Sequence, residues 1–351
     1  MTAVHVIVPA GIDDPARPSG GNAYDRQVCR GLAAIGWSVV ERAVPGSWPT
    51  PVASARAALV GTLAAVADGA VVLVDGLIAS AVPDVLVPEA DRLRLVVLLH
   101  MPLGDGRTGP DAAANECAAL SAAAAVVTTS RWSRRWLLER YPLRPDHVHV
   151  AEPGVDAAAL SPGTTGGGEL VCVAAVTADK GHDVLLAALA EVADLSWRCV
   201  CVGPVSNDPG FVDRLARQAR DTGLSDRVRF IGPRTGADLD AAYAAADALV
   251  LATRVESYAM VVSEALARGL PVLATAVGGL PEALGHVGGG RPGLLVPPGD
   301  VAAFAAALRC WLGDGDLRDR LREAARERRA GLCRWPVTSE RVSRVLAGVA
   351  T

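Results

Sequence analysis

Lysine, aromatic side chains and long apolar runs are scarce in this sequence of 351 residues. Only one of the 34 basic residues is a lysine, Lys180, and Phe, Trp and Tyr together make up 4% of the chain. No apolar run approaches the ~20 residues that a membrane-spanning helix needs. The chain opens directly into the strand-like segment VHVIVPA rather than into a signal peptide. We therefore expect a soluble, cytoplasmic protein, and its net charge of −4 gives no overall attraction to nucleic acid.

The seven cysteines lack the spacing of a metal site or of a disulfide framework. They are scattered and odd in number, and no Cys-x-x-Cys pair occurs. Cys199 and Cys201 alternate within an apolar run, which buried thiols in a strand explain better than metal ligands do. No Gly-x-Gly-x-x-Gly follows the first strand of either half, which argues against a dehydrogenase. We expect no metal and no cofactor.

Strand-like and helix-like segments alternate along the whole chain, and they fall into two sets. Strands are expected at 3–9, 37–44, 71–77, 93–100, 125–130 and 147–156, and again at 170–176, 197–203, 227–232, 248–253, 271–275 and 293–297. This alternation predicts an α/β fold of two Rossmann-like, doubly wound parallel-sheet domains that face a central cleft. The flexible segment LSPGTTGGGE is the expected linker, so the domains are placed at 1–158 and 159–335, with a last helix at 336–351.

Two carboxylates, Glu256 and Glu264, stand eight positions apart in the segment 253–282. The pattern predicts a helix from Ser257, which would separate the carboxylates by roughly 12 Å along its axis at ~1.5 Å per residue. This is the scale of a nucleoside diphosphate sugar, and the free N–H groups of a helix N-terminus suit its pyrophosphate. Taken alone, the two residues could equally be exposed carboxylates that favour the helix dipole.

Three further sets of residues follow predicted strands, at the edge where ligands gather in such sheets. Lys180-Gly181 opens a helix, which suits a phosphate, whereas a solvated surface lysine is the plain alternative. Gly20 and Gly21 form either a flexible turn or a place where backbone approaches a ligand. His100 ends a strand, where a histidine is more often structural than catalytic.

Taken together, these segments resemble a known family. The segment 253–282 is similar to the Glu-x7-Glu region of retaining GT-B glycosyltransferases of family GT4 (glycosyltransferase group 1). Lys180-Gly181 matches the family's phosphate-binding lysine, and GVD at 154–156 matches a segment before its second domain. VRFIG, DLDAAYAAADALVLAT and GLLVPPGD follow in the family's order. The resemblance covers nearly the whole chain and is densest from 170 to 300.

The resemblance implies an N-terminal acceptor-binding domain and a C-terminal donor-binding domain. Glu256 would contact the hydroxyls of the donor sugar, Glu264 the ribose and Lys180 the diphosphate, while His100 would face the reacting sugar. The catalytic set would be His100, Glu256 and Lys180. The donor-binding set would comprise Gly20, Gly21, Lys180, Arg254, Glu256, Ser257, Tyr258, Ala259, Met260, Val261 and Glu264.

Two positions depart from the family's pattern. Ala175 stands where the family has an arginine five residues before the lysine, so one cation of the diphosphate clamp is missing. Our hypothesis is that Arg254 or Arg234 replaces it. Ala259 stands where the family commonly has glycine, which would tighten or shift the sugar pocket.

The resulting prediction is a metal-independent, retaining hexosyl- or other glycosyltransferase that uses a nucleotide-diphosphate sugar and a small-molecule or glycan acceptor. By the resemblance, the departing phosphate would take the acceptor's proton, and the protein would position the reactants and stabilise charge. A nucleotide-sugar 2-epimerase of the same fold and a non-catalytic nucleotide-sugar-binding protein are the alternatives. The basic segment 131–144 favours a solvated helix over membrane docking. Donor base, donor sugar, acceptor, oligomeric state and pathway stay open.

Overall fold

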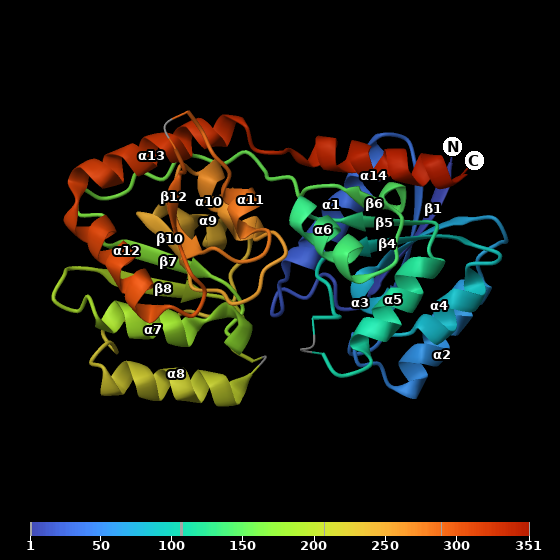
Figure 1. The fold of residues 1–351 in the computed structure, drawn as a ribbon, viewed down its shortest axis with the longest axis horizontal. Coiled ribbons are helices and arrows are strands. Elements are labelled where there is room, and N and C mark those ends of the chain that lie inside the picture. The colour runs from blue at the N-terminus through green and yellow to red at the C-terminus, as the bar shows by residue number, and fades with distance from the viewer. Residues whose placement is uncertain (1, 106–107, 207, 289, 351) are drawn as a thin grey trace. The chain divides into compact units, whose positions relative to one another are not determined.

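The computed structural model describes residues 2–105, 108–206, 208–288 and 290–350 (Figure 1). Its strands form two six-stranded sheets, and the strand pairings in both sheets are parallel. The chain divides into two compact units. The first comprises Met1–Asp14, Ser19–Gly154 and Cys333–Thr351, and the second comprises Pro15–Pro18 and Val155–Leu332.

The sheet of the first unit has the strand order β2-β1-β3-β4-β5-β6. Its strands are β1 (Ala3–Pro9), β2 (Ser38–Val44), β3 (Val71–Asp75), β4 (Arg94–Leu99), β5 (Ala125–Thr128) and β6 (Val148–Val150). Its helices are α1 (Gly20–Ala34), α2 (Ala53–Ala64), α3 (Gly76–Ala79), α4 (Pro83–Glu89), α5 (Ala112–Ala122), α6 (Arg131–Arg140), the 3-10 helix η1 (Pro145–His147) and α14 (Trp335–Ala350). The central strands are buried runs of valine and leucine, as a parallel sheet between helix layers requires.

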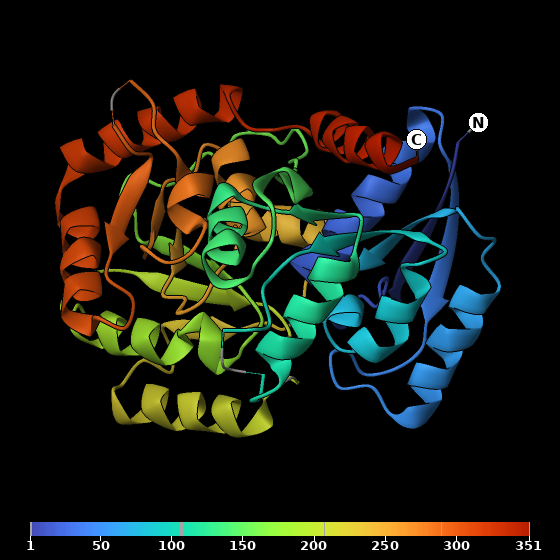
Figure 2. The same cartoon turned by 45° about the vertical axis from the view of Figure 1, so that its right-hand side comes forward.

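The sheet of the second unit has the strand order β12-β11-β10-β7-β8-β9. Its strands are β7 (Glu169–Val173), β8 (Arg198–Val202), β9 (Val228–Phe230), β10 (Ala248–Leu251), β11 (Val272–Thr275) and β12 (Gly293–Val296). Its helices are the 3-10 helix η2 (Ala178–Lys180), α7 (His182–Ala190), α8 (Pro209–Asp221), α9 (Gly236–Ala244), α10 (Met260–Ala267), α11 (Leu280–Leu284), α12 (Val301–Gly313) and α13 (Gly315–Ala330). Figures 1 and 2 show α7 and α8 side by side on one face of this sheet.

The last helix of the chain belongs to the first unit, where α14 lies beside α1 (Figures 1 and 2). Trp37 Nε1 donates a hydrogen bond to Ser343 Oγ at 2.8 Å. Gly31 of α1 permits the close approach, because a Cβ at this position would lie 1.9 Å from Ser339 Oγ. The sequence from Val155 to Leu332 therefore forms one unit without interruption, whereas the first unit needs both ends of the chain.

The predicted α/β class with two parallel, helix-covered sheets is confirmed. The predicted start of one helix is wrong, because α10 begins at Met260 and not at Ser257. The reason is Ala259, whose backbone takes the left-handed conformation (φ 72°) and so interrupts the helix at its expected start. Glu264 lies only four residues into α10, and the axial spacing expected between Glu256 and Glu264 does not apply.

Each unit has a hydrophobic core of its own on the faces of its sheet. The largest fully buried side chains include Trp311 and Tyr243 in the second unit and Tyr24 in the first. Among the helices of the described residues, none combines the length and the apolar composition that crossing a bilayer would require.

Candidate active site

In the first unit, His100 follows β4 and lies against the N-terminal turn of α1. Ser19 caps this helix, with its Oγ accepting a hydrogen bond from the Asn22 N–H at 3.1 Å. Gly20 and Gly21, expected to precede the helix, are its first two residues. A Cβ on Gly21 would lie 3.1 Å from His100 Cδ2, so the missing side chain lets the imidazole pack directly on the helix backbone.

Two buried carboxylates hold the His100 ring. His100 Nε2 lies 2.7 Å from Asp25 Oδ1 of α1 and 3.9 Å from Asp75 Oδ2 at the end of β3. Tyr24 adds an edge-on ring contact with a centroid distance of 5.2 Å. Asp75 also caps α3 by accepting from the Leu77 N–H at 2.6 Å. The orientation of the imidazole is thereby fixed by three side chains, two from α1 and one from the end of β3.

The charges of this cluster depend on one another. Burial acts to lower the pKa of His100, but the charge and hydrogen bond of Asp25, with the charge of Asp75, outweigh burial and raise the pKa to about 8. Burial and the charge of Asp25 raise the pKa of Asp75 to about 7. The three side chains present ligand atoms within 4.8 Å of one another, a set that could hold a cation. The raised pKa values of His100 and Asp75 mean that protons compete with a cation for these ligand atoms at neutral pH.

In the second unit, Lys180 and Glu256 form an ion pair. Lys180 ends η2, and its Nζ donates to Glu256 Oε2 at 2.8 Å. The Ser257 N–H donates to the other carboxylate oxygen at 3.1 Å. Burial acts to raise the pKa of Glu256, but Lys180 and the N–H groups of Tyr258 and Ser257 outweigh it and lower the pKa. Glu256 is therefore an ionised, firmly held carboxylate whose partner is the chain's one lysine.

Glycines let neighbouring backbone approach closely on both sides of this pair. Gly181 adopts a left-handed conformation between Lys180 and α7, and a Cβ there would lie 2.0 Å from the Ala252 carbonyl oxygen. Gly278 (φ 58°) approaches Glu256 in the same way, because a Cβ added at Gly278 would lie 1.6 Å from the Glu256 carbonyl oxygen. Only glycine accommodates both the backbone angle and the contact at these places.

Arg254 supports this arrangement through the backbone of η2. Its N–H donates to the Asp179 carbonyl at 2.7 Å, and its Nη1 donates to the Ala178 carbonyl at 2.6 Å. The guanidinium also forms a two-pronged ion pair with Asp183 at 2.7–2.8 Å. Arg254 would have to leave Asp183 to serve as the missing clamp cation, so that role stays a prediction. Arg234, the other candidate, donates to the Pro233 carbonyl at 2.8 Å.

The N-terminus of α10 follows directly after this pair. The described residues provide no side chain that caps α10, and no acidic residue lies in its first turn. The first N–H groups of α10 therefore lie at a helix N-terminus without a side-chain cap, which is a favourable place for an anion to bind. Ala259 and Tyr258 are buried, whereas Met260 and Val261 are partly exposed. The left-handed backbone at Ala259 gives a physical reason for the family's glycine: the position needs a positive φ more than it needs space.

Glu264 lies in the next turn of α10 and binds a different partner. Tyr243 of α9, fully buried, donates its hydroxyl to Glu264 Oε2 at 2.8 Å. Burial is the largest effect on Glu264 and raises its pKa, against the lowering influence of Tyr243 and Arg268. Glu264 is partly exposed, so it keeps access to solvent while Tyr243 fixes its direction.

The structure thus places the predicted residues in two separate clusters. The first unit joins Gly20, Gly21 and His100, and the second joins Lys180, Arg254, Glu256 and the first turns of α10. Sequence reasoning missed Asp25 and Asp75, the carboxylates that hold His100. Asp75 ends an apolar strand, VVLVD, and a charged residue at the carboxyl end of a buried strand is a signal that could have indicated it.

The whole chain superimposes on solved glycosyltransferase structures. Sucrose-phosphate synthase from Thermosynechococcus elongatus matches with a TM-score of 0.80 over 99% of both chains, at 21% sequence identity. HepE from Anabaena, solved in complex with UDP and glucose, matches with a TM-score of 0.77 over 99% of this chain and 100% of that one, at 18% identity. The fold is therefore the GT-B fold of glycosyltransferases.

The sequence comparisons match part of the chain to a family. Residues 164–328 match the family model of glycosyl transferases group 1. D-inositol 3-phosphate glycosyltransferase 1 of Catenulispora acidiphila is 32% identical over 280 residues, which are 75% of this chain and 65% of the relative. The D-inositol 3-phosphate glycosyltransferase of Corynebacterium diphtheriae is 30% identical over 283 residues, 76% of this chain and 65% of the relative. Residues 164–328 thus match the group 1 glycosyltransferases, and the aligned part of the chain spans 65% of the length of these curated relatives.

Proposed function

We propose that this protein transfers a sugar from a nucleoside diphosphate sugar to an acceptor hydroxyl, with retention at the anomeric carbon. The observation that carries the proposal is the Lys180–Glu256 pair at 2.8 Å, directly before the uncapped N-terminus of α10. This brings the ammonium at the end of η2 to an ionised carboxylate that precedes a helix end of positive partial charge. A nucleoside diphosphate sugar offers each of them a partner, namely phosphate oxygens and sugar hydroxyls.

Each residue has a role in this proposal. Lys180 and the first N–H groups of α10 bind the diphosphate and stabilise the charge that grows on it as the glycosidic bond breaks. Glu256 accepts hydrogen bonds from sugar hydroxyls, and Glu264, held by Tyr243, accepts from the ribose. His100, oriented by Asp25 and Asp75, contacts the reacting sugar. The departing phosphate takes the proton of the acceptor hydroxyl, so the chain itself supplies position and charge.

The comparisons guide the choice of substrates to test first. HepE was solved with UDP and with UDP-glucose, which favours a uridine donor as the first candidate. The curated relatives are named for D-inositol 3-phosphate, so phosphorylated polyols head the acceptor panel.

The test begins with donor binding. UDP-, GDP-, ADP- and dTDP-sugars are screened by thermal shift, because a ligand that binds the folded state stabilises it by mass action. A donor that shifts the midpoint is then incubated with the acceptor panel, and the anomeric configuration of the product is determined by NMR. The E323A variant, which removes an exposed carboxylate of α13, serves as the matched control for E256A and E264A.

The outcomes separate the proposal from its two rivals. Sugar transfer with retention, weakened in E256A and normal in E323A, supports it. An epimerised donor formed without acceptor would make the protein a 2-epimerase. Tight donor binding without turnover on any acceptor would leave a nucleotide-sugar-binding protein. If none of the donors shifts the midpoint, the proposed site is wrong.

A further inference from the structure

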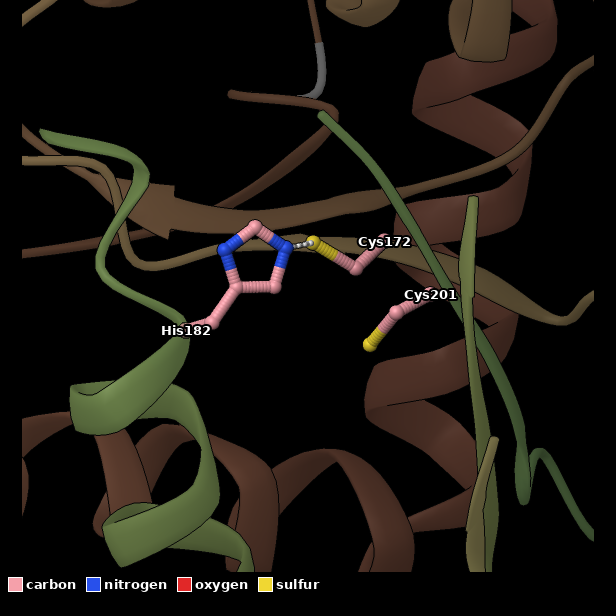
Figure 3. Close-up of side chains that lie close together, drawn as sticks. All are labelled: Cys172, His182 and Cys201. Atoms are coloured by element: carbon pink, nitrogen blue, oxygen red, sulfur yellow. Dashed lines mark hydrogen bonds between the residues drawn. The ribbon is translucent and has the colours of Figure 1, made fainter. Parts of the chain in front are cut away.

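A second cluster of chemically active side chains lies in the core of the second unit, separate from the Lys180–Glu256 pair. Cys172 of β7, Cys201 of β8 and His182 at the start of α7 point toward one another (Figure 3). His182 Nε2 lies 3.7 Å from Cys172 Sγ, and the three ligand atoms all lie within 4.8 Å of one another. At most 2% of any of these residues is exposed to solvent.

The fold explains how three distant positions come to meet. Cys172 and Cys201 are direct partners in the parallel register of β7 and β8, so their side chains leave the same face of the sheet side by side. The first turn of α7 covers this face and directs His182 toward the two sulfurs. The tilted ring of Phe230, with a centroid distance of 6.0 Å, packs on the imidazole.

Burying the His182 imidazole with so few hydrogen-bond partners is energetically unfavourable. Within the part of the chain that the structure describes, His182 Nδ1 is buried without a hydrogen-bond partner. The polar contact recorded for the ring is the weak one between Nε2 and Cys172 Sγ. A contact to sulfur of this length is weak, so an ion bound by Nε2 and the two sulfurs would replace it with stronger bonds.

Two thiols and one imidazole thus face a common centre in the core of the second unit. A metal cation at that centre would bring all three donors onto one ion.

We propose that Cys172, Cys201 and His182 form a binding site for one thiophilic d10 metal ion, Zn(II) or Cu(I). Thiolate sulfur and imidazole nitrogen are the donors that these ions prefer. With bonds of ~2.3 Å to sulfur and ~2.0 Å to nitrogen, donors on one ion lie about 3.5–4 Å apart, and the observed separations need only small side-chain rotations to match. Binding forms two metal–sulfur bonds and one metal–nitrogen bond, and the protons of both thiols pass to solvent.

A metal ion bound at this site would affect the candidate active site through the backbone that connects His182 to Lys180. His182 follows Lys180 by two residues, with Gly181 between them, so a metal bound at His182 would tie the Lys180 turn to β7 and β8. The spacing of the cysteines does not indicate this site, because its ligands come from two strands and a helix and not from a Cys-x-x-Cys motif. The inference does not depend on the proposed sugar transfer.

The test uses the full chain, stripped of metal under reducing conditions. One equivalent of Zn(II) or Cu(I) is added either to the native protein or during refolding, since the buried ligands become accessible when the unit opens. Native mass spectrometry counts the retained ions, competition with a chromophoric chelator ranks the two metals, and X-ray absorption reports the donor atoms. We expect one retained ion bound by two sulfurs and one nitrogen.

Variants decide whether the ion occupies this site. C172A/C201A and H182Q are expected to lose the ion, and circular dichroism checks that both remain folded. The C117A/C310A variant lacks two thiols outside the cluster, one partly exposed and one exposed, and is expected to retain the ion. Equal retention in C172A/C201A, or no retained ion with either metal under both loading conditions, would overturn the proposal.

Discussion

At the scale of single residues, the charge of His100 is set by its carboxylate neighbours. The folded-state pKa of about 8 lies above the ordinary value of 6.5. The pairing therefore contributes its full stability below about pH 6.5 and loses it as the pH rises through 8, a contribution of about 2 kcal/mol at ~1.4 kcal/mol per pKa unit. The raised pKa of Asp75 acts in the same direction, because the folded state resists its ionisation as the pH rises from the ordinary value of 3.8 towards 7.

Replacing Asp25 should reverse the balance at His100. In D25N the main charge that raises the pKa is gone, so burial dominates and the pKa of His100 should fall below 6.5. The measurement is a histidine titration by NMR. D84N, which removes an exposed carboxylate paired with Arg56, is the control and should leave the His100 titration as it is. A His100 pKa that stays near 8 in D25N would contradict the assignment of its cause.

Replacing Glu256 should affect nucleotide binding and sugar transfer differently. In E256Q the Lys180 ammonium loses its carboxylate partner, so a nucleoside diphosphate should bind at least as tightly as it does to the wild type. Sugar transfer should nevertheless fall by about 100-fold or more, the scale seen when one charge-stabilising contact of a transition state is removed. Calorimetry with the nucleoside diphosphate and initial rates measure the two effects independently. Weaker diphosphate binding in E256Q would show that Glu256 does not compete for Lys180.

The lysine itself should behave in the opposite way. In the proposed donor site, K180A removes a charge-assisted contact to phosphate, which contributes about 1.5–3 kcal/mol, or about 10- to 100-fold in affinity. Donor binding should weaken by that factor, and more than in E264A, where a hydrogen bond to the ribose is lost. The same calorimetric titration measures both variants. Unchanged affinity in K180A would remove Lys180 from the donor site.

At the scale of elements, the turn between η2 and α7 is fixed by one glycine. G181A would force a left-handed backbone on alanine and bring its Cβ to 2.0 Å from the Ala252 carbonyl oxygen. We expect lower stability, by more than the ~1 kcal/mol of the backbone angle alone, together with weakened donor binding because Lys180 moves. Thermal unfolding and donor titration are the measurements.

Gly223 provides the matched control for this element. It has a similar φ of 71°, but a Cβ there would meet no atom within 4 Å. G223A should therefore show the cost of the angle alone and leave donor binding unchanged. Equal effects of G181A and G223A would mean that the contact with Ala252 does not determine the position of Lys180.

The elements also show where sequence reasoning succeeds and where it stops. Runs such as VVLVD and RLVVLL are buried throughout or nearly so, and their residue types alone determine a strand. The start of α10 was not predictable in this way, because the left-handed backbone of Ala259 follows from its surroundings and alanine itself favours a helix. The clusters of Asp25 with His100 and of Cys172 with Cys201 depend on strand register, which no local pattern reveals.

At the scale of the whole molecule, the first unit is completed only by the end of the chain. G31A should separate α1 from α14, because the new Cβ would lie 1.9 Å from Ser339 Oγ and 2.6 Å from its Cβ. Hydrogen exchange should speed up in the first unit and remain slow in the second, since Val155–Leu332 contains none of this contact. S339G removes both atoms, so G31A/S339G should recover part of the protection. Faster exchange spread equally over both units would contradict this.

Lys180 also makes the protein suitable for selective chemical labelling. As the single lysine of the sequence, it offers amine-selective acylating reagents one ε-amino target, and 29% of its side chain is exposed to them. A label introduced there would mark the turn between η2 and α7 without any engineered residue. In the proposed donor site, protection of that amine from acylation would report how much of the protein has bound a nucleotide sugar.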